Sequence, residues 1–126
     1  MPTTLATTST RQKQLFQQYL AELNKHIADL KQGKATRVFE IREFAAMLYV
    51  HPIHLSNTVK EVSGKSTCDW YEESLLRISK ELLLETNLPI AAIARQLTYD
   101  PSNFTKFFKH FTGVTPKQFR NAHVNS

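Results

Sequence analysis

The stretch LTYDPSNFTKFFKHFTGVTP, residues 97–116, decides the fold of this chain. Four phenylalanines in it recur at the spacing i, i+3, i+4, i+7, which is one face of a helix. They are Phe104, Phe107, Phe108 and Phe111. The opposite face carries small polar side chains and lysines, namely Ser102, Thr105, Lys106 and Lys109. The pattern predicts a helix that its phenylalanines seat firmly, while hydrogen-bonding groups and cations face a partner.

The same pattern occurs a second time, earlier in the chain. A shift of 49 residues lays residues 39–70 over residues 88–119 without a gap. Six positions are identical, including a proline and a terminal glycine, and apolar positions match along the whole length. Self-similarity at a fixed period indicates one supersecondary unit that is used twice.

Each unit is predicted to be a helix, a tight turn and a second helix. The second helix opens at Pro52 or Pro101, because proline suits the first helical position. Asp100 is a good N-cap, and Gly64 and Gly113 are natural C-terminal stops. In a DNA-binding helix-turn-helix, the second helix lies in the major groove with its N-terminal residues facing base edges. We therefore predict an all-α fold with two helix-turn-helix units.

The outward faces of the two second helices supply the candidate DNA contacts. Lysine can reach guanine acceptors or phosphates, asparagine can read adenine, and isoleucine can meet a thymine methyl group. The candidates in the first unit are His51, Ile53, His54, Ser56, Asn57 and Lys60. Those in the second unit are Ser102, Asn103, Thr105, Lys106 and Lys109. The plainer alternative is an amphipathic helix with a solvated polar face, and an exposed isoleucine more often packs at a rim.

Enzyme and metal chemistry find little support in the sequence. His51 and His54 form an H-x-x-H pair, but no acidic or thiol partner sits at ligand spacing, so we expect no metal site. No paired-carboxylate, Ser-His-Asp or Cys-His arrangement and no Gly-rich phosphate loop occurs, which argues against an enzyme and against a cofactor. Tyr49 and Tyr71 are expected to have no role beyond packing.

Composition and charge narrow the class of partner. The 126 residues are 41% hydrophobic and 21% charged, with a net charge of +5. Residues 88–126 hold five basic residues and one acidic residue, and this basic asymmetry favours a polyanionic partner. The single cysteine, Cys68, excludes an internal disulfide, and no apolar run approaches the ~18 residues of a membrane span. We expect a soluble intracellular protein without a membrane partner.

The sequence of the N-terminal third predicts one long helix, from about residue 11 to residue 32. Its apolar residues recur at spacings of four and three and form a narrow stripe: Phe16, Leu20, Leu23, Ile27 and Leu30. Two interpretations stay open. The stripe packs on the rest of the domain, or it contacts a partner, as a short dimerising coiled coil or as the face of a helical protein-interaction module.

These elements predict the organisation of the whole chain. Residues 67–85 read as one long joining helix between the two units. The predicted order is a mobile N-terminus (1–10), an N-terminal helix and connection (11–37), a bipartite domain (38–121) with helix-turn-helix units at 39–64 and 88–113, and a tail (122–126).

The second unit resembles the signature of the AraC/XylS family of bacterial transcription regulators. That signature is IA-x-x-L, a turn, S-x-F-x-x-x-FK, and then G-x-x-P-x-x-[FY]-R. The matching residues are Ile93, Ala94, Leu97, Ser102, Phe104, Phe108, Lys109, Gly113, Pro116, Phe119 and Arg120. The resemblance covers about residues 38–121. It implies a regulator that binds double-stranded DNA sequence-specifically, reading two adjacent major-groove segments from units bridged by the joining helix.

The resemblance also implies RNA polymerase as a partner, a monomer or a weak dimer through the N-terminal helix, no cofactor, and a place at the bacterial nucleoid in the cytoplasm. Thr98-Tyr99 stands where the family usually has Gly-Phe or Gly-Tyr, with one residue fewer before Phe104, which predicts a tighter turn. Val59-Lys60 is a lighter anchor than the family's Phe-Lys. Most members carry a separate ligand-binding domain, so we expect either a fragment or a stand-alone regulator. Operator, effector and the sign of regulation are not predicted.

Overall fold

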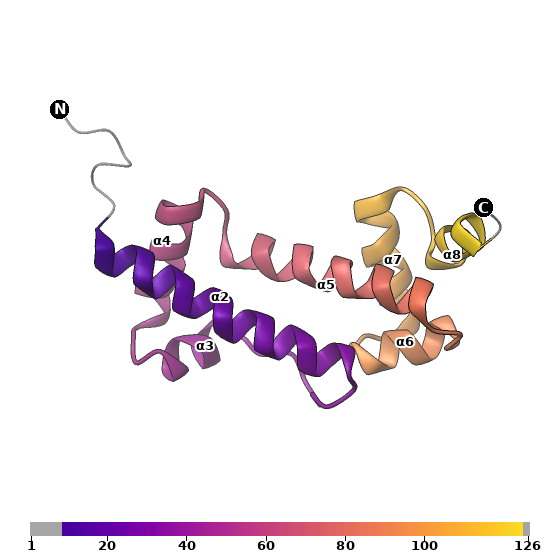
Figure 1. The fold of residues 1–126 in the computed structure, drawn as a ribbon, viewed down its shortest axis with the longest axis horizontal. Coiled ribbons are helices and arrows are strands. Elements are labelled where there is room, and N and C mark those ends of the chain that lie inside the picture. Colours follow the sequence, from indigo (N-terminus) through magenta and orange to yellow (C-terminus); the bar gives the residue numbers. More distant parts are fainter. Residues whose placement is uncertain (1–8, 125–126) are drawn as a thin grey trace. The chain divides into compact units, whose positions relative to one another are not determined.

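The computed structural model describes residues 9–124, and Figure 1 shows their course. This part of the chain forms seven helices and no strand, which confirms the all-α prediction. The helices are α2 (Thr10–Lys31), α3 (Ile41–Met47), α4 (Pro52–Ser63), α5 (Thr67–Glu85), α6 (Ile90–Gln96), α7 (Pro101–Thr112) and α8 (Pro116–Val124). The predicted mobile segment lies outside the described residues, apart from Ser9 and Thr10, and Thr10 already begins α2.

The helices belong to two compact units. The first combines the residues up to His26 with Phe39–Glu73, and the second combines Ile27–Val38 with the residues from Ser74 onward. The long helices α2 and α5 each contribute one part to each unit. Each unit therefore contains one helix-turn-helix, α3–α4 or α6–α7, packed on segments of two longer helices.

The core of the first unit brings α2, α3, α4 and the start of α5 together. Leu55 and Val59 are fully buried on α4. The ring of Tyr19 in α2 meets Phe44 in α3 edge-on, with ring centroids 5.5 Å apart. Burying one large apolar side chain contributes about 1.5–3 kcal/mol, so these contacts fix α3 and α4 against the unit.

The apolar stripe of α2 is used inside the chain. Phe16, Leu23, Ile27 and Leu30 are each at most 8% exposed. These four positions pack inside the chain, as the first interpretation predicts, while Leu20 is half-buried. A dimer through this helix stays a prediction.

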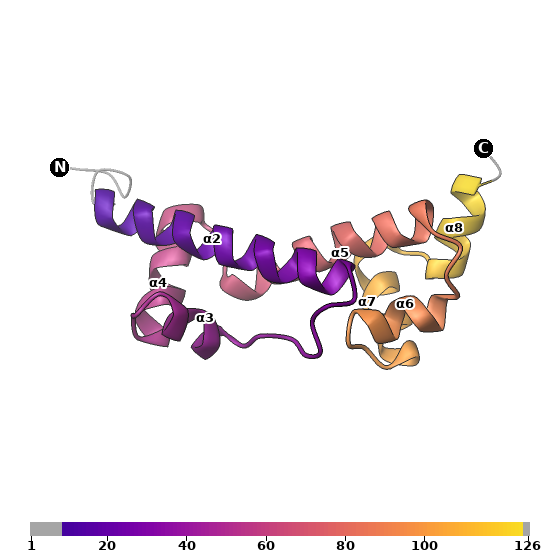
Figure 2. The ribbon, with the colours of Figure 1, turned by 60° about the horizontal axis from the view of Figure 1, so that its bottom comes forward.

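The second unit is built around two phenylalanines of α7. Phe104 and Phe108 are fully buried, as predicted, together with Ile93 and Ala94 of α6. Phe119 of α8 meets Phe108 edge-on at 5.3 Å between ring centroids. Figure 2 shows α6, α7 and α8 gathered beside the C-terminal part of α5. Helix α7, the second helix of this helix-turn-helix, thus packs against both α6 and α8.

The 49-residue repeat extends further in the structure than in the sequence comparison. Helices α3 and α6, α4 and α7, and α5 and α8 begin at positions that differ by 49. Residues 122–124, predicted as part of a tail, lie in α8, which corresponds to the first turns of α5. The two turns of this chain, residues 48–51 and 97–100, have the same length. A second turn tighter than the family's usual one stays a prediction.

Matching caps explain why both units end their second helix alike. The hydroxyl of Ser63 bonds the carbonyl oxygens of Val59 and Lys65 at 2.6 and 3.1 Å. Thr112, 49 residues later, bonds Phe108 and Val114 in the same way at 2.8 and 3.0 Å. The glycine after each hydroxyl residue is left-handed, with φ of 79° and 81°, a conformation in which glycine carries no Cβ penalty.

Candidate nucleic-acid interface

The N-terminus of α7 is held by its cap. Oδ2 of Asp100 accepts hydrogen bonds from the backbone N–H and the hydroxyl of Ser102, at 3.1 and 2.8 Å. These bonds, above all the one from the Ser102 hydroxyl, hold the pKa of the Asp100 carboxyl below its ordinary value. Pro101 occupies the first helical position, as predicted. The start of α7 is therefore fixed at the end that would approach base edges.

The seating of α7 involves fewer phenylalanines than the sequence predicted. Phe111 is 44% exposed and Phe107 is half-buried. Phe107 stacks on Tyr99 at 5.4 Å, and Phe111 leans on Phe107 at 5.2 Å. The expectation that all four rings seat α7 is wrong for Phe111, which stays 44% exposed.

The opposite face of α7 presents the predicted polar residues to solvent. Ser102, Asn103, Lys106 and Lys109 are exposed. Thr105 is half-buried, and its hydroxyl donates to the carbonyl oxygen of Pro101 at 3.1 Å, so this hydroxyl is engaged within the helix. The two lysines lie one turn apart on this face, which makes them its strongest candidates for contact with an anion.

The corresponding face of α4 has a different character. His51 caps the helix, because its Nδ1 accepts the backbone N–H of Ile53 at 3.1 Å. The exposed candidates are His51, His54, Asn57, Lys60 and Ile53, and Ile53 is 65% exposed. Ser56, the remaining candidate, is half-buried. Lys60 corresponds to Lys109 and Asn57 to Lys106 under the 49-residue shift, so α4 offers one lysine where α7 offers two.

Sequence reasoning missed Tyr49, which precedes α4 in the turn. Its side chain is 94% exposed, so the expectation of a packing role is wrong. Its φ is +58°, and Thr98 at the equivalent position of the second turn has φ +66°. The family resemblance was the available signal of this backbone conformation. The family usually has glycine at the position of Thr98, which is equivalent to Tyr49 in the first turn.

Arg120 shows that the basic C-terminal third is not all available to a ligand. Its guanidinium donates to the carbonyl oxygens of Leu83, Leu88 and Thr86, at 2.9, 2.7 and 3.3 Å. These carbonyls lie at the end of α5 and in the loop that follows. Arg120 therefore ties α8 to that loop, and its charge is committed to structure within the second unit.

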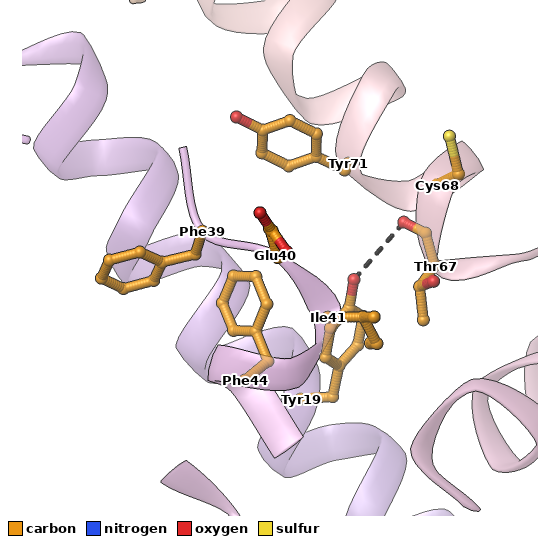
Figure 3. Close-up of a pocket in the computed structure, with 8 residues that line it drawn as sticks. All are labelled: Tyr19, Phe39, Glu40, Ile41, Phe44, Thr67, Cys68 and Tyr71. Carbon is orange, nitrogen blue, oxygen red and sulfur yellow. Dashed lines mark hydrogen bonds between the residues drawn. The ribbon is translucent and has the colours of Figure 1, made fainter. Parts of the chain in front are cut away.

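A cavity of about 320 Å³ lies in the first unit, lined by residues of α2, α3, α5 and the segment before α3 (Figure 3). Its lining is largely aromatic and comprises Tyr19, Phe39, Glu40, Ile41, Phe44, Thr67, Cys68 and Tyr71. The hydroxyl of Tyr19 donates to the carbonyl oxygen of Thr67 at 3.4 Å, and burial raises the pKa of Tyr19 to about 12. The Glu40 carboxylate pairs with Arg42 at 3.2 Å. These groups serve packing and capping.

Two observations on residues 9–124 concern metal binding and membrane insertion. No group of three or more His, Cys, Asp or Glu side chains in this range could hold a metal ion. No helix in the same range is long and apolar enough to cross a membrane. The exposed faces of α4 and α7 carry most of the residues that the sequence predicted as DNA contacts.

Comparison with known proteins bears on the family of this chain. Residues 44–122 match the model of a family described as "Helix-turn-helix domain". The chain is 31% identical over 104 residues to the arabinose operon regulatory protein of Escherichia coli strain K12, covering 82% of this chain and 32% of that protein. It thus spans about a third of the length of the curated relatives that it matches.

Solved structures share the arrangement of helices. The C-terminal domain of AraT, a response regulator from Geobacillus stearothermophilus, aligns with a TM-score of 0.71 and 28% identity, covering 92% of this chain and 88% of that one. The DNA-binding domain of AdpA, solved in complex with a target DNA, aligns with a TM-score of 0.67 and covers 82% of this chain and 91% of that one. At 19% identity, the AdpA comparison bears on the fold alone.

Proposed function

Because the chain belongs to the AraC/XylS family of helix-turn-helix transcription regulators, we propose that it binds double-stranded DNA sequence-specifically through α4 and α7. One observation carries the proposal. Two helices of 12 residues, 49 positions apart, share the same start, the same left-handed glycine cap, a buried apolar face and an exposed polar face. A helix fixed at both ends can hold side chains against base edges, which a loosely seated helix cannot.

Each helix would read one of two adjacent major-groove segments. Lys106 and Asn57 lie one turn into their helices, where a side chain reaches base edges, and we assign them to base contacts. Lys109 and Lys60 lie at equivalent positions further along, and we assign both to phosphates, which every sequence offers. One chain with two such helices reads a site that is not a palindrome, because each half of the site is bound by a different helix of the same chain.

The proposal extends to the state and setting of the protein. The buried stripe of α2 favours binding as a monomer over a dimer through that helix. Reading an operator places the protein at the nucleoid in the cytoplasm and makes RNA polymerase the expected protein partner. A pull-down of RNA polymerase on operator DNA, compared with DNA lacking the operator, tests that partnership.

Selection of bound sequences from a random duplex pool tests the main proposal. We expect one enriched motif of two unequal halves without twofold symmetry. The affinity for that motif should fall steeply with salt, because each neutralised phosphate releases counterions. A protein that binds every duplex alike at moderate salt, or binds none, would falsify the proposal. A contact through an apolar helix face would instead show little salt dependence.

A further inference from the structure

Three exposed apolar side chains cluster in sequence around the start of α4. Met47, at the end of α3, is 40% exposed, Tyr49 in the turn is 94% exposed, and Ile53 in the first turn of α4 is 65% exposed. All three belong to the first unit. Single exposed apolar residues are ordinary, but Tyr49 and Ile53 lie within three residues in sequence of Pro52, the N-terminus of α4, and the N-terminus of a reading helix is the end that faces base edges.

Tyr49 holds its exposed position at an energetic cost. Its φ of +58° is the left-handed conformation, which is unfavourable for every residue with a Cβ atom. A ring that is 94% exposed gains almost nothing from packing to offset this cost. Thr98 has the same backbone conformation but is half-buried, so the turn itself does not require an exposed side chain. The exposure of Tyr49 is therefore a property of the first unit alone.

The charge on the two reading faces points to the chemistry of the contact. The exposed face of α7 holds Lys106 and Lys109, whereas that of α4 has Asn57 and Lys60 at the corresponding positions and Ile53 in its first turn. Fewer cations and more apolar surface favour an apolar base contact at α4. The thymine methyl is the apolar group that base pairs present in the major groove.

We infer that Tyr49 and Ile53 read thymine methyl groups in the DNA segment bound by α4. The inference rests on the proposed DNA binding and deepens it, since it names the base chemistry that one of the two reading helices selects. It predicts that the half-site for α4 is rich in thymine at the positions that these two side chains reach. The half-site for α7 has no such requirement.

Replacing thymine by deoxyuridine in the selected operator tests the inference directly, because this change removes only the methyl group. We expect affinity to fall about fourfold for each contacted methyl, the fold-change that corresponds to ~0.8 kcal/mol for a buried methylene-sized group. The same replacement in the α7 half-site should leave affinity unchanged. Unchanged affinity after replacement throughout the α4 half-site would overturn the inference.

Matched variants assign the effect to side chains. Tyr49→Ala and Ile53→Ala should each bind the thymine and deoxyuridine operators with more nearly equal affinity. Tyr49→Phe should keep the wild-type ratio, because it keeps the ring. Thr98→Ala, at the equivalent position of the other unit, should also keep it. A Tyr49→Phe variant that behaves like Tyr49→Ala would overturn the inference in favour of a hydroxyl contact to the DNA backbone.

Tyr49→Gly separates contact from fold. Glycine removes the strain of the left-handed backbone, so the variant should melt at a higher temperature and yet lose the share of thymine discrimination that Tyr49 supplies, as Tyr49→Ala does. Full wild-type discrimination in this variant would overturn the assignment to Tyr49. If sedimentation shows that the free protein forms dimers and that Tyr49→Ala dissociates them, the surface binds a second copy and the inference is likewise overturned.

The two proposals can fail separately. A protein without sequence preference contradicts the proposed DNA reading as a whole. A protein that prefers a sequence but binds the deoxyuridine operator equally well contradicts only the thymine contact.

Discussion

Thr98 lies 49 residues after Tyr49, and both residues hold a left-handed backbone, with φ of +66° and +58°. Each backbone N–H bonds a carbonyl three residues back, Arg95 for Thr98 at 2.9 Å and Ala46 for Tyr49 at 3.2 Å. The next residue in each turn bonds the carbonyl five residues back, at 2.8 and 3.0 Å. This pair of backbone hydrogen bonds ends a helix around a left-handed residue, which is most often glycine. Both turns therefore force a residue with a side chain into a glycine-like conformation.

Thr98→Gly should stabilise the protein. The hydroxyl of Thr98 is buried without a hydrogen-bond partner among the described residues, and its backbone is strained. Relief of about 1–2 kcal/mol of left-handed strain, less ~0.5–1 kcal/mol for glycine's flexibility, should raise the free energy of unfolding. Removing the unsatisfied hydroxyl adds to this gain. Thr98→Ala is the control, since it removes the hydroxyl and keeps the strain. Urea denaturation in which Thr98→Ala gains as much as Thr98→Gly would contradict the strain argument.

Phe108→Ala should destabilise the second unit severely. Truncating a fully buried phenylalanine costs about 3–5 kcal/mol, and Phe108 also supports Phe119 of α8. Phe111→Ala, on the same helix but 44% exposed, should cost about 1 kcal/mol or less. Thermal melting and DNA affinity should fall together for Phe108→Ala. Lost binding with unchanged melting would place Phe108 against the DNA instead.

Lys109→Ala and Lys106→Ala should weaken DNA binding in different ways. Loss of a phosphate contact at Lys109 should weaken binding to all duplexes alike and reduce the salt slope by about 0.9. Loss of a base contact at Lys106 should relax preference at one or two base pairs by roughly 1–3 kcal/mol. Affinities for single-base operator variants at two salt concentrations separate the two outcomes. If Lys109→Ala changes the ranking and Lys106→Ala does not, the roles are reversed.

Arg120→Ala should lower stability by about 2 kcal/mol, because three carbonyl oxygens lose a charged donor. Arg120→Lys should recover little of this, since one ammonium cannot span carbonyls that a planar guanidinium reaches together. Lys117→Ala is the matched control, because it removes the same charge from an exposed position of α8. A smaller DNA salt slope with unchanged unfolding in Arg120→Ala would show that the arginine contacts DNA rather than the loop after α5.

Tyr19 should make the protein sensitive to alkali. Burial disfavours the phenolate and raises its pKa from 10.0 to about 12, so the folded state binds the proton more tightly than the unfolded state does. The associated stability is fully present below pH 10 and is lost as pH rises through 12, by roughly 1.4 kcal/mol for each pH unit. Tyr19→Phe should show a flatter fall across this window in denaturant titrations. Equal slopes for the two proteins would show that Tyr19 does not carry the effect.

The sequence by itself determined six of the seven described helices, the two turns and the double use of one unit, whereas α8 (Pro116–Val124) was not predicted as a helix. Proline at the first helical position, glycine at the last and apolar residues at a helical period are local signals, because they act through the backbone within a few residues. They placed the start of α4 at Pro52 and of α7 at Pro101, and they identified Phe104 and Phe108 as core residues. The same signals, with the family signature, singled out the polar faces of α4 and α7.

Only the tertiary structure decided which side chains are covered and which are free. Phe111 continues the helical stripe of Phe104 and Phe108 but is 44% exposed, whereas those two are fully buried. The sequence places Arg120 among the basic residues of the C-terminal third, but its guanidinium donates hydrogen bonds to carbonyl oxygens at the end of α5 and in the loop that follows. Tyr49 read as a packing residue, although its turn lifts it into solvent. Burial depends on segments that are remote in sequence, and no local pattern records where those segments pack.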